Sequence, residues 1–478
     1  MNFRLISSTL GRVLFIEAAC LVLPLLCSII YKEVYITDYL LCIGICVLTG
    51  LVLALFKPKN KAFYSKEGFV TVALSWIIIS IFGAFPFMVT GFVPNFFDAF
   101  FETASGFSTT GASILSDVEA LPKSLLLWRS CTNWIGGMGV LVFLVAILSL
   151  SGGSNVYLIK AESPGPSVSK LVPKVKEGAK ILYLIYMGLT FLEFVLLLFG
   201  GLDLFSALTT AFSNAGTGGF GILNSSIAEY SSYVQWVITI FMLIFGVDFS
   251  IYYLILLRKF KSVFKSDEFK AYIGIVVVAT VIITINCLSI FGNIWETLRH
   301  SAFQVASIIT TTGFSTTDFD LWPSLSKTIL VILMFFGGCA GSTAGGMKVS
   351  RIILLLKSVV KEIKILAHPR TTFKTTMNGR VVEHETIRGV NVFTAVYFAI
   401  FAGALLLISI DNFDFTTNFT AVTATINNIG PGLSMVGPTC NFSGFSDFST
   451  FILSMVMLTG RLEIFPMLML FAPTTWRK

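Results

Sequence analysis

Charged side chains are scarce in this chain of 478 residues: Asp, Glu, Lys and Arg make up only 12%, while hydrophobic residues make up 55%. The mean hydropathy is +0.85. Soluble globular domains carry about a quarter charged residues, so this composition excludes that class. We therefore expect a polytopic membrane protein, in which the apolar runs are helices because every backbone amide in lipid must be satisfied internally.

Histidine is also scarce, and the cysteines follow no metal-binding pattern. The chain has only His300, His368 and His384, and its eight cysteines stand mostly inside apolar runs without metal-ligand spacing. We interpret them as small buried hydrophobic residues. No Gly-x-Gly-x-x-Gly fingerprint lies on a strand–helix unit, and no set of nucleophile, base and metal can be assembled. We expect neither an enzyme nor an organic cofactor.

Ten apolar runs approach the roughly 20 residues that a membrane-spanning helix needs. Although Arg4 and Arg12 flank the first run as in a signal peptide, no small-residue cleavage site follows, and the second run pairs with it as a hairpin. The runs are residues 13–31, 39–56, 70–89, 125–150, 181–200, 234–257, 271–291, 327–356, 390–410 and 448–471.

Most of the 33 Lys and Arg fall in the connections on one side of these spans. By the positive-inside rule, ten spans with both the N- and the C-terminus in the cytoplasm satisfy this asymmetry. The net charge of +7 is thereby explained without a nucleic-acid partner. The sequence therefore predicts that the protein lies in a lipid bilayer.

A short polar loop, residues 108–113 (Ser-Thr-Thr-Gly-Ala-Ser), recurs along the chain. Residues 311–315 repeat it closely, residues 217–221 loosely, and residues 428–432 keep only the central glycine. The copies are roughly one hundred residues apart, which indicates an internal repeat. Each follows a run of about 10–14 residues, the length of a re-entrant half-helix rather than of a span. These short runs are residues 95–107, 203–214, 295–307 and 414–427.

The fold class that follows is an all-α membrane protein with an N-terminal helical hairpin and four helix–pore-loop–helix repeats around a central pore, in a pseudo-fourfold arrangement. The hairpin contributes no polar intramembrane group, so we expect a peripheral element rather than part of a pathway. The predicted boundaries are residues 1–66 for the hairpin and 67–165, 166–265, 266–380 and 381–478 for the repeats.

Four acids, Asp98, Asp203, Glu296 and Asp414, stand in or near the first turns of the short runs. A carboxylate there complements the positive end of a helix, and simple capping is the reading we favour. A ring of acids that attracts cations to an outer mouth is the alternative.

The repeated loop has a physical use in a membrane. A chain that descends as a half-helix and returns as an extended Thr-Gly strand can point backbone carbonyls at an axis, where they replace the water around a potassium ion. Glycine is needed because such a strand adopts conformations that strain a residue with a Cβ. Helix packing through small residues is the alternative for one copy, but four copies in the same context disfavour it. The predicted filter residues are Thr110, Gly111, Thr217, Gly218, Thr312, Gly313, Ile429 and Gly430.

The run 327–356 is interrupted by ten residues of poor helix propensity, 337–346. Unwound backbone at this depth must face a cavity, so we place it directly below the filter, where it can occlude the pore and move to open it. Close helix packing through small residues is the alternative. The predicted gate residues are Gly337, Gly338, Gly341, Ser342, Thr343, Gly345 and Gly346.

Arg461 and Glu463 place charge inside the last apolar run. Intramembrane charge is costly and by default indicates function, and residues two apart on a helix do not face each other. We expect Arg461 to set an electrostatic barrier beneath the filter and to hold the unwound loop through its carbonyls. Glu463, near the cytoplasmic end, is expected to be a structural partner.

Together these features resemble the Trk/Ktr/HKT superfamily of potassium transporters. The resemblance covers all four repeats, and the extra N-terminal hairpin is similar to the bacterial TrkH branch rather than to the shorter Ktr branch. Ala344 is one departure, because related sequences often continue the glycine run there. The shared motifs are residues 134–139 (WIGGMG), 161–166 (AESPGP), 180–186 (KILYLIY), 217–220 (TGGF), 311–315 (TTGFS), 337–343 (GGCAGST), 427–432 (NNIGPG) and 460–463 (GRLE).

The resemblance implies potassium uptake across a bacterial cytoplasmic (inner) membrane, by a homodimer whose protomers each hold a pore with potassium in the filter. It also implies a cytosolic nucleotide-binding regulatory subunit, for which the basic segments 151–180 and 350–389 offer a docking surface. Glycine at the filter centres is associated with potassium preference, whereas some plant relatives with serine in the first loop favour sodium. A sodium or mixed-cation pathway, a scaffold or sensor without transport, and a membrane-embedded enzyme acting on lipids stay as alternatives.

Overall fold

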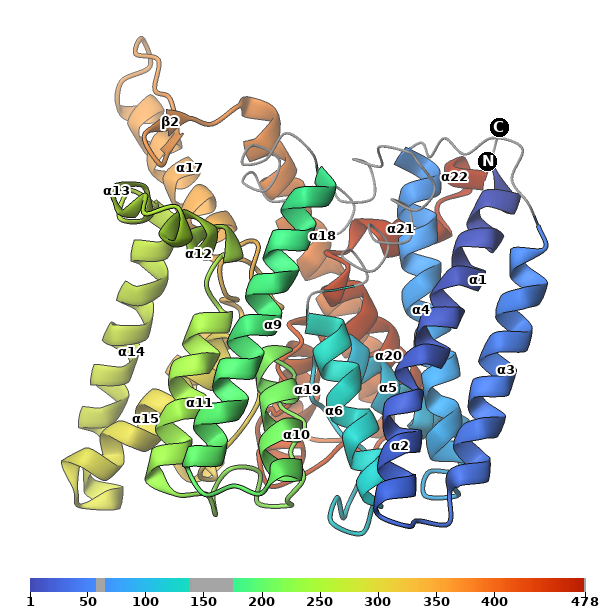
Figure 1. The fold of residues 1–478 in the computed structure, drawn as a ribbon. Helices are drawn as coiled ribbons and strands as arrows, with labels where there is room; N and C mark the ends of the chain where they lie inside the picture. The colour runs from blue at the N-terminus through green and yellow to red at the C-terminus, as the bar shows by residue number, and fades with distance from the viewer. Residues whose placement is uncertain (57–64, 138, 140–174, 477–478) are drawn as a thin grey trace.

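The computed structural model describes residues 1–56, 65–137, 139 and 175–476. These residues are helical apart from loops and one antiparallel strand pair, β1 (Thr376–Met377) with β2 (Arg380–Val381) (Figure 1). The expected all-helical membrane protein is therefore confirmed for the described part of the chain. Both chain ends lie on the same side of the molecule, which we call the terminal side.

The N-terminal segment forms the expected hairpin, and its first arm is a single span interrupted only at Leu21. Its helices are α1 (Phe3–Cys20), α2 (Val22–Ile30) and α3 (Ile36–Ala54). Glycines let the arms approach closely, because a Cβ on Gly11 would lie only 2.6 Å from the Gly50 carbonyl oxygen. The hairpin stands at one flank of the molecule in Figure 1 and shares a hydrophobic core with α4, α5 and α6.

After the hairpin, the order of a long helix, a short helix, a loop and a second helix occurs four times. The long helices are α4 (Ser65–Val89), α9 (Val175–Phe199), α14 (Asp267–Phe291) and α18 (His384–Ile408). The short ones are α5 (Phe96–Phe107), α10 (Leu204–Ala215), α15 (Ile294–Ile309) and α19 (Phe415–Ile426), close to the predicted bounds.

The second helices differ more from one another than the sequence suggests. They are α6 (Lys123–Gly137), α11 (Ser232–Phe245) with α12 (Phe249–Leu256), α16 (Ser324–Met334) followed after a loop by α17 (Val349–Ala367), and α20 (Asp447–Arg461) with α21 (Phe465–Phe471). Short helices α13 (Phe260–Val263) and α22 (Pro473–Trp476) and the 3-10 turns η2 (Phe319–Leu321), η3 (Ser409–Asp411) and η4 (Ser434–Val436) complete the described chain.

The described residues contain six helices long and apolar enough to cross a membrane, or seven if the pair α11 and α12, bent by 92°, counts as one span. The ten expected spans stay a prediction for two reasons. Run 125–150 leaves the described residues after Gly137, and runs 327–356 and 448–471 are broken helices rather than continuous ones.

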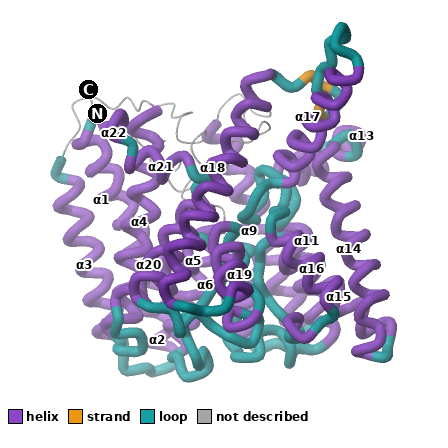
Figure 2. The backbone as a smooth tube through the Cα atoms, turned by 180° about the vertical axis from the view of Figure 1, so that it is seen from behind, coloured by secondary structure: helices purple, strands orange, loops and turns teal. Residues whose placement is uncertain are grey.

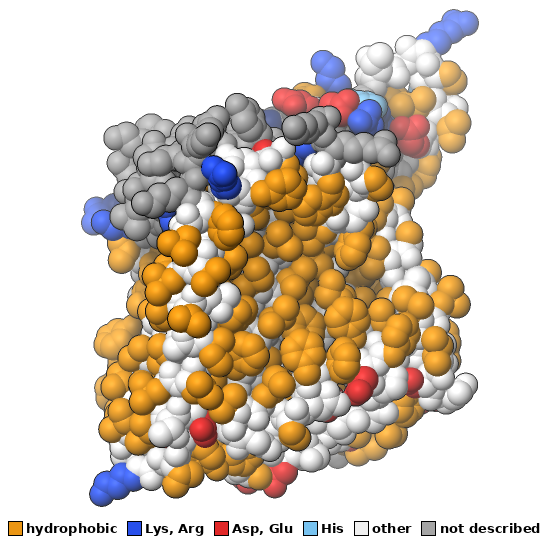
Figure 3. All heavy atoms as spheres, turned by 90° about the vertical axis from the view of Figure 1, so that its right-hand side faces the viewer, with side chains coloured by type: hydrophobic (Ala, Val, Ile, Leu, Met, Phe, Trp, Pro, Cys, Tyr) orange, Lys and Arg blue, Asp and Glu red, His pale blue; other side chains and the backbone are white. Residues whose placement is uncertain are grey.

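A band of hydrophobic side chains crosses the middle of the surface, with charged side chains near its two ends (Figure 3). Hairpin residues such as Leu48 and Leu55 are largely exposed, at 68% and 75%. Exposed apolar side chains arranged in a belt are what a bilayer requires of the helices that face it.

The four short helices begin in the same way, with an Asn or Asp whose side chain accepts a hydrogen bond from a backbone N–H of the first turn. These N-caps are Asn95, Asp203, Asn293 and Asp414. Such caps satisfy N–H groups that no helix carbonyl can reach, which lets a helix begin inside a protein. The tube in Figure 2 shows the short helix α19 grouped with the long helix α18 and the second helix α20, both of which it contacts.

The close approach of α1 and α3 gives a stability prediction. Gly11→Ala should destabilise the protein by about 1–3 kcal/mol, because the new methyl group would collide with the backbone of α3. Gly44→Ala on α3 is the matched control, since no atom of another segment that the structure describes lies within 4 Å of its Cβ position. Equal thermal unfolding midpoints for the two purified variants would contradict the proposed packing.

Candidate functional site

Four loops follow the short helices, and we number them in chain order: loop 1 (residues 108–113), loop 2 (216–221), loop 3 (310–315) and loop 4 (427–432). Each has a non-glycine residue in the left-handed region near φ +56°, and two positions later a glycine with positive φ. The first residues are Thr109, Thr217, Thr311 and Asn428, and the glycines are Gly111 (φ +77°), Gly219 (φ +68°), Gly313 (φ +86°) and Gly430 (φ +97°).

The left-handed residue closes each short helix. The N–H of the residue after it donates to the carbonyl five positions earlier, as in Thr110 to Ser105 at 2.8 Å and Thr312 to Ser307 at 2.8 Å. The same bond joins Gly218 to Ser213 and Ile429 to Ala424, both at 2.9 Å. This is the Schellman arrangement, which normally places glycine at the left-handed position. Thr there costs backbone strain of about 1–2 kcal/mol per residue, whereas Asn tolerates this conformation better. Such strain is concentrated at functional sites.

The shared backbone shifts the register that we expected for loop 2. Gly219, rather than Gly218, has the conformation of Gly111, while Gly218 matches Thr110 in position. Thr217 adopts the left-handed conformation of Thr109. Thr217 is therefore equivalent to Thr109 and not, as the Thr-Gly spacing suggests, to Thr110. In the other three loops the expected Thr-Gly or Ile-Gly pair is in the same register.

The four loops meet in a closed ring, in which each positive-φ glycine lies against a carbonyl oxygen of a neighbouring loop. No side chain fits there, because a Cβ would overlap that oxygen. The distances from such a Cβ to the oxygen are 1.9 Å (Gly111 to Gly218), 1.9 Å (Gly219 to Thr312), 2.0 Å (Gly313 to Ile429) and 2.8 Å (Gly430 to Thr110). The four carbonyls come from equivalent positions, one per loop, and the contacts run from loop 1 through loops 2, 3 and 4 back to loop 1.

A cavity of about 100 Å³ adjoins the ring and is lined by Gly111, Gly219, Gly313 and Gly430. Its other walls come from residues that follow these glycines, such as Ser113, Gly221 and Ser315, so it lies on the side where the chain leaves the ring. Among the residues that the structure describes, Arg129 is the only charged one in its lining. The cavity is therefore a vestibule to the ring.

On the opposite side, the loops are held at the ends of their helices by hydroxyl and amide groups. The Ser108 and Thr110 hydroxyls lie 2.7 Å apart, and those of Thr310 and Thr312 lie 2.8 Å apart. The Asn428 amide donates to the Thr110 hydroxyl at 3.0 Å and so ties loop 4 to loop 1. Because all four short helices end at the ring, the negative ends of their dipoles favour a cation there.

The unwinding expected in run 327–356 is confirmed, since no α-helix is assigned between Met334 and Val349. We call residues 335–348 the intramembrane loop. The Gly345 N–H donates to the Thr311 hydroxyl at 2.6 Å, and a Cβ on Gly345 would lie 2.7 Å from the Asn427 carbonyl oxygen. The intramembrane loop thus touches loops 3 and 4 at the ends of their helices.

Backbone groups of the intramembrane loop find partners on the bent pair α11 and α12 and on Glu268. The Cys339 N–H donates to the Gly246 carbonyl at 2.9 Å, and the Gly341 carbonyl accepts from the Phe249 N–H at 3.1 Å. The Glu268 carboxylate accepts from the N–H groups of Ala340 at 2.8 Å and Ser350 at 3.0 Å. The loop is thereby satisfied without being helical, as backbone at membrane depth must be.

Arg461 holds the intramembrane loop through a carbonyl, as the sequence predicts. Its guanidinium donates to the Thr343 carbonyl at 2.8 Å and to the Gly137 carbonyl at 2.8 Å, with a further bond to Gly136. The second contact joins the loop to the described end of α6. The sequence does not reveal this partner, since the two residues are 324 positions apart.

Glu463 forms an ion pair with Arg351 of α17, so it is the structural partner that we expected. The Arg351 guanidinium also lies 4.0 Å from the centroid of the Phe393 ring. Glu463 and Ile464 both have positive φ, and a β-branched residue such as Ile464 is an outlier there. The strained turn between α20 and α21 begins directly after Arg461.

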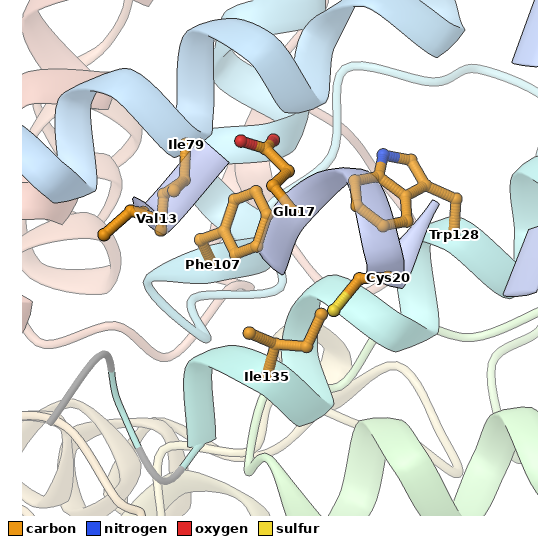
Figure 4. A pocket seen from close by; sticks show the side chains of 7 residues that line it. All are labelled: Val13, Glu17, Cys20, Ile79, Phe107, Trp128 and Ile135. Carbon is orange, nitrogen blue, oxygen red and sulfur yellow. The ribbon is translucent and has the colours of Figure 1, made fainter. Parts of the chain in front are cut away.

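The N-terminal hairpin does contain a polar intramembrane group, which corrects the expectation that it has none. Glu17 on α1 is 4% exposed, and neither carboxyl oxygen has a hydrogen-bond partner in the described part of the chain. Figure 4 shows it beside a cavity of about 20 Å³, large enough for one water molecule, with Phe107 and Trp128 as neighbours. A single acid in an apolar run was the signal that sequence reasoning missed.

Four further buried acids escaped notice because their partners are remote in sequence, and one of them, Glu67, accepts from the Asn2 N–H at 3.3 Å. Glu102 pairs with Arg129 at 2.7 Å, and Glu193 accepts from the Asn214 amide at 2.5 Å. Glu268, described above, caps the intramembrane loop. Cys440 is exposed, so the expectation of buried cysteines does not hold for it.

Of the four acids near the helix starts, Asp203 and Asp414 are N-caps, as we favoured. Asp98 and Glu296 lie in first turns whose caps are the asparagines named above. Hydrogen bonds from the hydroxyl and the N–H of Thr417 lower the pKa of Asp414. All four stand at the opposite ends of the short helices from the ring.

Segment 151–180, predicted as part of a docking surface, and motif 161–166 lie largely or wholly outside the described residues. Segment 350–389 comprises most of α17 and the strand pair, and these project from the terminal side (Figure 1).

Comparison with known proteins agrees with this architecture. Residues 38–478 match the family model TrkH, described as a cation transport protein. The chain is 35% identical to the Trk system potassium uptake protein TrkH of Escherichia coli K12, with all of both chains covered, and 30% identical to TrkG of that strain, with all of this chain and 99% of TrkG covered. The crystal structure of the potassium transporter TrkH from Vibrio parahaemolyticus superposes with a TM-score of 0.89 at 32% identity, over the whole of both chains. The chain belongs to the TrkH family of cation transport proteins.

Proposed function

We propose that this chain takes up potassium across the cytoplasmic membrane of a bacterium, through a selectivity filter formed by loops 1 to 4. The observation that carries the proposal is the ring, in which one carbonyl from each loop meets the glycine of a neighbour. Relatives that match along their full length are named as potassium uptake proteins, which supports the choice of ion.

The filter works through backbone carbonyls. The oxygens of Thr110, Gly218, Thr312 and Ile429 form one layer that replaces the hydration shell of a potassium ion. Gly111, Gly219, Gly313 and Gly430 allow this layer to close, because any side chain there would displace a carbonyl. Thr217 adopts the left-handed turn that delivers Gly218. The ends of the four short helices add a favourable potential for a cation.

The wider architecture follows from the ring. Four helix–pore-loop–helix repeats, residues 67–165, 166–265, 266–380 and 381–478, surround one pore with pseudo-fourfold symmetry, and residues 1–66 flank it. The order of contacts around the ring, from loop 1 to loop 4 and back, supports this arrangement. Counting broken helices as spans gives ten, with the terminal side in the cytoplasm.

The intramembrane loop is the gate. Gly337, Gly338, Gly341, Ser342, Thr343, Gly345 and Gly346 provide a segment without helical hydrogen bonding, and its contact with Thr311 sets it against the inner end of the filter. Arg461 holds it in place and puts a positive charge where a potassium ion would leave the filter. For the gate to open, Arg461 must release its hydrogen bonds to Thr343 and to the end of α6.

The protein acts as a homodimer, one pore per protomer, with a cytosolic nucleotide-binding subunit. The relatives belong to a Trk system, a name that implies further components. Helix α17, which projects from the terminal side in Figure 1, carries Lys357, Lys361 and Lys364, and Arg351 near its start is paired with Glu463 next to the gate. A partner docking on α17 would therefore act on the turn that positions Arg461.

Cation-replacement flux tests the proposed ion. Purified full-length protein in liposomes should pass potassium and rubidium faster than sodium, and Gly313→Ser or Gly219→Ser should reduce that preference by about tenfold or more, since a misplaced binding group costs one to two orders of magnitude. Sodium flux equal to rubidium flux in the wild type would favour the mixed-cation alternative. Wild-type selectivity in both variants would remove the ring from the pathway.

The gate makes a separate prediction. Arg461→Ala should raise the open probability in single-channel recordings several-fold without changing the potassium-to-sodium ratio, because it frees the Thr343 carbonyl and leaves the filter intact. Arg388→Ala, on an exposed part of α18, is the control and should behave as the wild type. An unchanged open probability for Arg461→Ala would exclude the arginine from gating.

A further inference from the structure

A buried ion pair stands beside loop 1. Glu102 on α5 and Arg129 on α6 have side chains that are 0% and 2% exposed, and the Arg129 Nε lies 2.7 Å from a Glu102 oxygen. A buried pair of this kind contributes little net stability, yet removal of one partner leaves an uncompensated charge. Pulling the two charged side chains apart is therefore costly. The backbone and hydroxyl groups that hydrogen-bond to the pair are held in fixed positions.

The pair contacts two neighbouring loops as they leave the ring. Glu102 accepts hydrogen bonds from the Ser113 hydroxyl at 3.1 Å and the Ile114 N–H at 3.2 Å, both on the chain after Gly111. Arg129 donates to the Gly221 carbonyl at 3.0 Å, and its guanidinium lies 4.2 Å from the centroid of the Phe220 ring. One ion pair thus fixes the outgoing strands of loops 1 and 2 relative to each other.

We call the contact between two neighbouring loops a seam. The seam between loops 1 and 2 is one of the tightest in the ring, because a Cβ on Gly111 would lie 1.9 Å from the Gly218 carbonyl oxygen. The other seams are tied by uncharged backbone or hydroxyl groups and, after loop 4, by the carboxylates of Asp320 and Asp318. Loop 3 bonds Ile227 at 3.0 Å, the segment after loop 4 bonds Asp320 through Ser434 at 3.1 Å, and Phe442 bonds Ser113 at 2.9 Å.

No other loop repeats the buried charge pair within the described residues, since the Lys327–Asp320 pair next to loop 4 is about one-third exposed. The position of Glu102, seven residues before the left-handed residue, is occupied by Thr210, Gln304 and Ala421 in the other three short helices. The carbonyls of loops 1 and 2 are therefore positioned by a rigid charged contact that the other half of the ring lacks.

We propose that Glu102 and Arg129 are positioning residues for ion selectivity: by fixing the outgoing strands of loops 1 and 2, they hold the Thr110 and Gly218 carbonyls too far apart to close around the smaller sodium ion. The inference rests on the proposed filter. It assigns the discrimination of potassium from sodium to Glu102 and Arg129, which do not touch the ion. The ring itself supplies the oxygens that coordinate the ion.

The test is the potassium-to-sodium permeability ratio from reversal potentials, measured on full-length protein in planar bilayers. Glu102→Gln keeps the shape of the side chain, and Arg129→Lys keeps the charge but loses the fork that reaches Gly221. Each should lower the ratio by about tenfold or more, the factor that corresponds to loss of one charge-assisted hydrogen bond. A structural role alone would lower protein yield or melting temperature and leave the ratio unchanged.

Asp267→Asn is the matched control, because it breaks the ion pair with Lys357 at the start of α14, away from the ring, and should preserve the ratio. If the two pair variants do not assemble, Ser113→Ala carries the test, since its hydroxyl contacts both charged side chains. A wild-type ratio in the variants that assemble overturns the inference. Absence of potassium preference in the wild type instead overturns the proposed filter itself.

Discussion

The structure depends on how four helices stop in the middle of a membrane. A helix end exposes carbonyl groups that lipid cannot satisfy, so each end must be closed by the chain itself. Here the same turn closes all four, with Thr109, Thr217, Thr311 or Asn428 in the left-handed conformation. That turn also aims the next carbonyl and glycine toward the neighbouring loop. The same turn therefore both satisfies the helix end and builds the ring.

Around this ring, several buried acids hold neighbouring segments in place. Glu102 and Arg129 support loops 1 and 2, Glu193 supports the end of α10 through Asn214, and Glu268 satisfies the intramembrane loop. Burying these groups is unfavourable unless they are hydrogen-bonded, and most of their contacts are to backbone or to short polar side chains next to a loop. Glu17 is different, because it faces a small cavity without a partner in the described residues.

Local sequence signals predict the parts of the fold that depend on local physics. The lengths of the short helices, their acidic or amide starts, and the unwinding between Met334 and Val349 follow from composition and propensity. The register of loop 2 does not, because Thr-Gly-Gly can be aligned in two ways and only the backbone angles distinguish them. The partners of Arg461, Glu102 and Glu268 cannot be predicted from the sequence either, because packing brings together segments that are far apart in the chain.

The central claim is that the four carbonyls of Thr110, Gly218, Thr312 and Ile429 coordinate the transported ion. The most direct measurement is the electron density of the wild-type protein in rubidium or thallium, with anomalous scattering to identify the ion. The account predicts an anomalous peak on the axis of the ring, lost when sodium replaces the heavier ion. A ring without such a peak, or a peak only outside the four loops, would contradict it.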